Sequence, residues 1–130
     1  MVAVSVGSMA NSYEGLKVWK ASMRLAKDVY AVSNSGALGS DWGLRDQIRR
    51  SAVSIPSNIA EGFERGSSKD FARFLSIAKG SAGELRTQIM LCKSTGHLTD
   101  HVADDLVDRC SQISRMLMGL IASIRAREIG

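Results

Sequence analysis

At 130 residues and 14.0 kDa the chain has the size of one domain, and its mix of 45% hydrophobic and 23% charged residues excludes a disordered polymer. Its net charge of +4 and pI near 9.4 favour anionic partners. No stretch reaches the roughly 18 apolar residues of a membrane helix, and the N-terminus lacks the basic region of a signal peptide, so we expect a cytoplasmic protein without membrane contact.

The composition predicts an all-α fold, because the chain has one proline, six methionines and no long apolar-polar alternation. We expect residues 1–11 to form a disordered tail and residues 12–130 to form one helical-bundle domain. Cys92 and Cys110 lie among apolar helical positions without the paired spacing of a zinc or redox site, which predicts buried, reduced thiols.

Two apolar stripes at helical spacing predict the first helix over residues 13–32. We expect the first stripe in the core, and because a second stripe exceeds what one partner helix needs, we expect that one at a subunit interface. The first comprises Leu16, Trp19, Met23, Ala26 and Tyr30, and the second comprises Val18, Ser22, Leu25, Val29 and Val32.

A third side of this helix is basic. Lys17, Lys20, Arg24 and Lys27 follow one another at intervals of three or four residues, so their charges share one edge. Such an edge is either an ordinary solvated face or a contact surface for a polyanion.

Residues 34–43 hold three glycines among small residues and predict a loop, after which apolar periodicity predicts a second helix over residues 44–61. Arg45, Arg49 and Arg50 form the densest basic cluster of the chain, and we expect Arg50 to pair with Asp46. Pro56 lies within this helix, where nearby hydroxyl and amide groups can compensate for the backbone donor that proline lacks.

Gly62 and Gly66 are expected to bracket the next loop, and Ser67 with Asp70 predicts the N-terminal cap of a third helix over residues 68–94. Gly80 and Gly83 lie inside that helix, where each costs about 1 kcal/mol relative to alanine. We expect close packing against another helix to explain them, since no strand precedes them as in a phosphate-binding loop.

Gly96 predicts the end of the third helix, and a fourth helix is expected to begin near Thr99 or Asp100. Its apolar stripe runs regularly from Val102 to Ile124. Short connections between successive helices predict antiparallel neighbours, and hence an up-down-up-down four-helix bundle.

No group of side chains predicts catalysis, a metal site or a cofactor, so we expect the protein not to be an enzyme. His97 and His101 have ligand-like spacing but straddle a helix start, and neither follows a glutamate at the interval of the di-iron bundles. Glu61 and Glu84 lie on different helices and are as compatible with structural contacts as with acid-base chemistry.

Three segments resemble one bacterial family. They are residues 44–52, the Ser-Ile-Pro-Ser-Asn-Ile-Ala-Glu-Gly run at residues 54–62, and residues 80–85. They resemble proteins encoded in intervening sequences of large-subunit ribosomal RNA genes and the accessory protein of diversity-generating retroelements, over residues 13–125. The resemblance implies an antiparallel four-helix bundle that assembles into a homopentameric barrel, with Arg45, Arg49 and Arg50 as leading basic contacts. It also implies nucleic-acid binding and contact with a reverse transcriptase in the retroelement relatives.

Two functions follow as expectations. Residues 13–95 hold 13 Lys/Arg against 8 Asp/Glu, a balance of +5, so an oligomer of such chains would offer many phosphate contacts. The first function is therefore an oligomeric binder of RNA or DNA with low sequence specificity. The alternative is an interaction scaffold that docks a partner protein such as a reverse transcriptase.

Overall fold

The structure is a computed structural model that describes residues 11–129, so the tail expected over residues 1–11 lies, apart from Asn11, outside the described residues. The described chain is helical and contains no strand. Its elements are η1 (Tyr13–Gly15), α2 (Lys17–Val32), α3 (Gly36–Ser40), α4 (Trp42–Glu64), α5 (Ser68–Ser94) and α6 (Asp100–Ile129).

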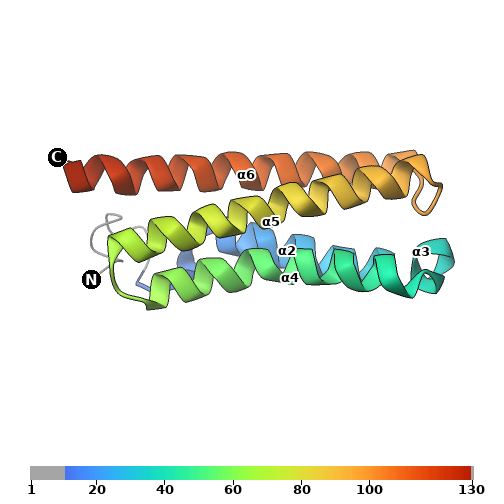
Figure 1. Cartoon of the computed structure of the whole chain (residues 1–130), viewed down its shortest axis with the longest axis horizontal. Helices are drawn as coiled ribbons and strands as arrows, with labels where there is room; N and C mark the ends of the chain where they lie inside the picture. Colours follow the sequence, from blue (N-terminus) through green and yellow to red (C-terminus); the bar gives the residue numbers. More distant parts are fainter. Residues whose placement is uncertain (1–10, 130) are drawn as a thin grey trace.

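The long helices α2, α4, α5 and α6 lie side by side and alternate in direction along the chain (Figure 1). This arrangement confirms the expected all-α helical bundle. Each long helix contacts the next long helix along the chain, and α2 also contacts α6, which closes the bundle. None of the helices within residues 11–129 is both long enough and apolar enough to cross a membrane.

Capping side chains fix where α5 and α6 begin. The Ser67 hydroxyl accepts a hydrogen bond from the Asp70 backbone N–H at 3.1 Å, and the Thr99 hydroxyl accepts one from the Val102 N–H at 3.3 Å. Each cap satisfies a backbone donor that a helix start leaves free. The predicted limits of α5 and the predicted start of α6 are therefore confirmed.

The second helix is longer than its apolar pattern predicted. Asp41 caps α4 by accepting from the Leu44 N–H at 3.2 Å, so the helix begins at Trp42 and not at Leu44. It also continues through Gly62, which was wrongly placed in a loop. A Cβ at Gly62 would lie 2.5 Å from the Cβ of Phe74, so glycine lets α4 and α5 approach closely there.

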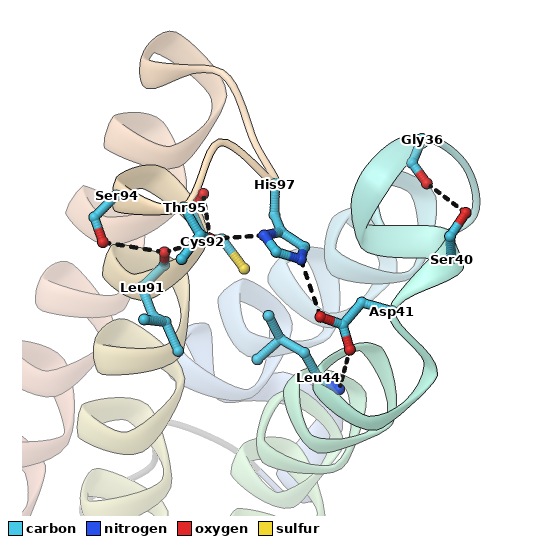
Figure 2. A network of polar contacts seen from close by, with 9 residues as sticks. All are labelled: Gly36, Ser40, Asp41, Leu44, Leu91, Cys92, Ser94, Thr95 and His97. Carbon is cyan, nitrogen blue, oxygen red and sulfur yellow. Dashed lines mark hydrogen bonds and ion pairs between the residues drawn. The ribbon is translucent and has the colours of Figure 1, made fainter.

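The loop predicted over residues 34–43 contains the short helix α3, which buries Leu38 completely. A polar cluster then joins this end of the bundle to the turn between α5 and α6 (Figure 2). The second Asp41 carboxylate oxygen lies 3.0 Å from His97 Nε2, and His97 Nδ1 lies 2.6 Å from the Thr95 hydroxyl oxygen. Asp41 thus caps one helix and contacts the connection between two others.

The core assignment on α2 was partly wrong. Leu16 and Ala26 of the first stripe are buried as expected, but most of the second stripe, which was expected at a subunit interface, also lies inside the bundle. Val18, Leu25 and Val29 are buried inside the bundle, and Ser22 joins them by donating its hydroxyl hydrogen to the Trp19 carbonyl oxygen at 2.8 Å. A serine whose hydroxyl is satisfied by its own helix is compatible with a dry core. The stripe expected inside includes the exposed residue Met23, which together with the half-exposed Tyr30 faces outward.

The expected role of Gly80 and Gly83 is also wrong within one chain. A Cβ at either position would meet nothing within 4 Å, and both residues are exposed on the outer face of α5. Neither glycine therefore serves close packing between helices of the same bundle.

Candidate nucleic-acid interface

The four cations of α2 lie where a large ligand can reach them. Lys17, Lys20, Arg24 and Lys27 are all exposed, and within residues 11–129 none of them forms an ion pair. The carboxylate nearest along the helix is that of Asp28, which instead pairs with Arg109 of α6 at 2.8 Å. The basic edge of α2 therefore keeps its positive charge uncompensated.

Arg49 holds two helices together. Its Nε donates to the Ser33 hydroxyl oxygen at 2.8 Å, and one Nη donates to the Ser33 carbonyl oxygen at 3.3 Å. The guanidinium also lies over the Tyr30 ring, 4.6 Å from its centroid. Because Ser33 ends α2, the cation lies at the negative end of that helix dipole, and its contacts stabilise the α2–α4 pair.

Arg45 is likewise engaged within the chain. It donates from Nη1 to the Gly39 carbonyl oxygen at 3.3 Å and pairs through Nε with Asp46 at 3.2 Å. The expected pair between Arg50 and Asp46 is therefore wrong, since Asp46 takes Arg45 instead. Of the three clustered arginines, Arg50 is the exposed one, and it forms no ion pair within residues 11–129.

An apolar groove runs along the outside of the contact between α2 and α4. This α2–α4 groove has a volume of about 420 Å³. Met23, Tyr30 and Val53 keep 45%, 44% and 41% of their surface exposed, so three large apolar side chains lie together along one groove. Its lining comprises Tyr13, Trp19, Met23, Ala26, Lys27, Tyr30, Val53, Pro56, Ser57 and Ala60.

The groove and the arginines share one surface. Tyr30 and Val53 also line a second depression, which Arg49 and Arg50 line as well. Lys27 lies in the wall of the groove, so the structure brings this lysine of α2 close to the arginines of α4. Lys17, Lys20 and Arg24 continue the basic edge along the rest of α2.

Sequence reasoning missed the apolar part of this surface. Trp19, Met23 and Tyr30 were assigned to the core because large apolar side chains at helical spacing usually face inward. The available signal was the pair of apolar stripes on one helix, whose combined width exceeds what one bundle buries. The core takes the second stripe together with Leu16 and Ala26 of the first, and leaves Met23 and Tyr30 outside.

The other polar residues that the sequence singles out make separate contacts within residues 11–129. No group of three His, Cys, Asp or Glu side chains in the described part of the chain could hold a metal ion. Glu61 is exposed and pairs with Arg65 at 3.0 Å, while Glu84 accepts a hydrogen bond from the Ser51 hydroxyl at 3.1 Å. His101 is exposed and His97 contacts Asp41, so the two histidines lie in different surroundings.

Both cysteines are buried, as predicted. Burial raises the pKa of the Cys92 thiol to about 11, with a smaller contribution from the Asp41 carboxylate, and raises the pKa of the Cys110 thiol to about 12. At neutral pH both are protonated thiols and poor nucleophiles.

Comparisons with known proteins agree with this architecture. Residues 14–119 match the family described as 23S rRNA-intervening sequence protein. Among solved structures, the chain resembles a protein of unknown function from the S23 ribosomal protein family of Bacteroides thetaiotaomicron VPI-5482. The TM-score is 0.75 at 24% sequence identity, over 81% of this chain and 95% of that one. That likeness shows a shared fold. No curated protein matches the sequence.

Proposed function

Given that the chain belongs to the 23S rRNA-intervening sequence protein family, as the motifs in residues 44–62 and 80–85 predicted, we propose a non-enzymatic role for it. It acts as a cytoplasmic homo-oligomer that binds RNA or DNA with low sequence specificity. The observation that carries the proposal is the exposed, unpaired row of Lys17, Lys20, Arg24 and Lys27. Cations without carboxylate partners are free to replace the counterions of a phosphate backbone.

The α2–α4 groove supports the oligomeric part of the proposal. Its exposed Met23, Tyr30 and Val53 form an apolar patch that a second copy of the chain can cover. In a closed ring each copy uses one surface to cover another surface of its neighbour, so the basic edges of all copies repeat around the ring. We propose the homopentamer that the family resemblance implies.

The same groove also favours a second candidate function, an interaction scaffold. In that case Met23, Tyr30 and Val53 dock a partner protein such as a reverse transcriptase, and Lys27 and Arg50 steer the encounter. The dependence of affinity on salt concentration distinguishes the two functions. Phosphate binding weakens steeply as ionic strength rises, whereas apolar docking responds little.

The test is an electrophoretic titration of a structured RNA at several KCl concentrations. It compares the wild type with a quadruple variant in which Lys17, Lys20, Arg24 and Lys27 become alanine. We expect weaker binding and a salt slope smaller by about 3, because each phosphate contact contributes about 0.7 to 0.9. Helicity is expected to stay unchanged, since all four side chains are exposed, and oligomer size is measured in parallel because Lys27 borders the α2–α4 groove.

A matched variant removes four cations elsewhere. Lys69, Arg115, Arg125 and Arg127 are also exposed and form no ion pair within residues 11–129, so their replacement changes the net charge equally. A smaller loss with this control locates binding on α2. Equal losses of affinity in the two variants would mean that net charge alone explains the binding. If the wild type does not bind RNA, the scaffold is the better explanation.

A further inference from the structure

A polar depression lies on the outside of the contact between α4 and α5. It has a volume of about 440 Å³, within the range of small-molecule pockets. Its lining is polar throughout, in contrast to the apolar α2–α4 groove, and comprises Gln47, Arg50, Ser51, Ser54, Glu84 and Gln88. We call it the α4–α5 pocket.

One acceptor in this pocket lacks a partner. The side-chain oxygen of Gln88 is buried and accepts no hydrogen bond from residues 11–129. A buried acceptor without a donor costs about 1 to 3 kcal/mol, so a ligand that supplies the donor gains affinity from this position. The amide group of Gln88 offers such a ligand either an acceptor or a donor.

Two opposite charges line the pocket without pairing with each other. Arg50 and Glu84 form no ion pair, although both border the same depression. The Ser51 hydroxyl, itself buried, donates to one oxygen of Glu84 at 3.1 Å and holds the carboxylate in place. The second carboxylate oxygen, the remaining lone pair of the first and the Arg50 guanidinium are left for a ligand that carries donors on one edge and acceptors on another.

The pocket is built on a fixed polar network. The hydroxyls of Ser54 and Ser81 lie 2.8 Å apart across the two helices, and Asn58 donates to the Ser54 hydroxyl oxygen at 2.9 Å. These contacts tie α4 to α5 beside the pocket, so the two helices that carry its lining side chains are fixed relative to each other before a ligand arrives. A pocket whose backbone is already fixed loses less conformational entropy when a ligand binds, which raises the affinity.

From this arrangement we infer that the α4–α5 pocket binds a guanine base of a single-stranded segment of the bound nucleic acid. The inference rests on the proposed function and adds one base preference to it. Guanine carries two adjacent donors, N1–H and the N2 amine, which match the Glu84 carboxylate. It also carries two adjacent acceptors, O6 and N7, which match an arginine fork such as that of Arg50. Uracil offers carbonyl oxygens beside its one donor, and these repel a carboxylate.

The first test uses mononucleotides. Binding of guanosine 5′-monophosphate and inosine 5′-monophosphate to the full chain is measured by nuclear magnetic resonance, following the side-chain amide of Gln88. The two ligands differ in the N2 amine alone, so their phosphates contribute equally. We expect inosine monophosphate to bind about tenfold more weakly, the effect of losing one good base contact.

Two variants test which side chain contacts which edge of the base. In Glu84→Gln the preference for guanine over inosine is expected to disappear, and in Arg50→Ala the preference for guanine over 7-deazaguanine, which lacks the N7 acceptor, is expected to disappear. Glu64→Gln and Arg115→Ala are matched controls, because both residues are exposed and lie outside the pocket. Melting curves check that all four variants remain folded.

A second test separates this inference from the proposed function. An RNA hairpin with one loop guanosine is titrated beside the same hairpin with inosine at that position. Equal affinities for the two hairpins, or an unchanged preference in Glu84→Gln, overturn the guanine pocket while RNA binding stands. If neither hairpin binds, the proposed function fails, and the inference fails with it. A preference for guanosine that Glu84→Gln removes and Glu64→Gln retains supports both.

Discussion

The reactivity of the Cys92 and Cys110 thiols measures how well the core excludes water and reagents. With a pKa of about 11, Cys92 is about one part in a thousand thiolate at pH 8, against about one part in ten for an ordinary thiol of pKa 9. We expect iodoacetamide to modify both cysteines at least about a hundredfold more slowly in the folded chain than in the unfolded chain. Mass spectrometry of samples quenched over time measures this ratio. Equal rates in both states would contradict the burial of the thiols.

The raised pKa values of the two thiols make the free energy of unfolding fall as the pH becomes alkaline. The folded state holds the thiol protons more tightly than the unfolded state, so this contribution is complete below about pH 9 and is lost as the pH rises toward 11. Replacing both cysteines with alanine should flatten that part of the curve of unfolding free energy against pH.

Two glycines of the bundle respond to alanine in opposite directions. Gly62→Ala places a methyl group 2.5 Å from the Phe74 Cβ, so we expect a loss of about 1 to 3 kcal/mol of unfolding free energy from overpacking. Gly83→Ala meets nothing within 4 Å on the surface of α5, so we expect a gain of about 0.5 to 1 kcal/mol from helix propensity. Urea denaturation of both variants measures the difference. A loss of stability in Gly83→Ala would show that Gly83 packs against a second copy of the chain.

At the scale of elements, the contact between His97 and Asp41 couples the start of α4 to the connection between α5 and α6. Asp41→Ala removes both the cap of Leu44 and the partner of His97, whereas His97→Ala leaves the cap intact. We expect losses of about 2 and about 1 kcal/mol respectively, with a coupling energy of about 0.5 to 1 kcal/mol in the double variant. Thermal or urea unfolding of the four proteins completes the cycle. Strictly additive effects would mean that the contact contributes nothing of its own.

The helices themselves were predictable, because their signals are local. Apolar periodicity and the Ser67 cap gave the limits of α5, and Gly96, with a φ of +75°, ended it as expected. The orientation of α2 was not predictable from periodicity, since both of its stripes are apolar and the choice depends on what α4 and α6 present to it. Arg49 shows the same limit. Its partner Ser33 lies at the end of α2, and a contact between side chains of different elements leaves no regular spacing in the sequence from which it could be predicted. The Gly62 contact with Phe74 depends likewise on how two helices cross.

At the scale of the whole molecule, the exposed apolar groove predicts self-association. We expect the wild type to scatter light at several times 14.0 kDa at micromolar concentration, and Val53→Glu to lower that mass by placing a charge in the groove. Ile77→Glu is the matched control, because Ile77 on α5 is 43% exposed against 41% for Val53 and lies away from the groove. A monomeric wild type, or equal effects of the two substitutions, would contradict an interface at this groove.

The closure of the bundle between α2 and α6 has a kinetic consequence. The pairs α2–α4, α4–α5 and α5–α6 each join long helices that follow one another in the chain, whereas the Asp28–Arg109 ion pair joins the first long helix to the last. Consecutive helices meet after short loop closures, and bundles of this kind fold in microseconds to milliseconds. We therefore expect the contact between α2 and α6 to form after the contacts between consecutive helices, because it closes the longest loop. Since α2 carries four of the cations proposed to bind phosphate, a ligand that binds this edge only in the folded chain is expected to stabilise the closed bundle against unfolding.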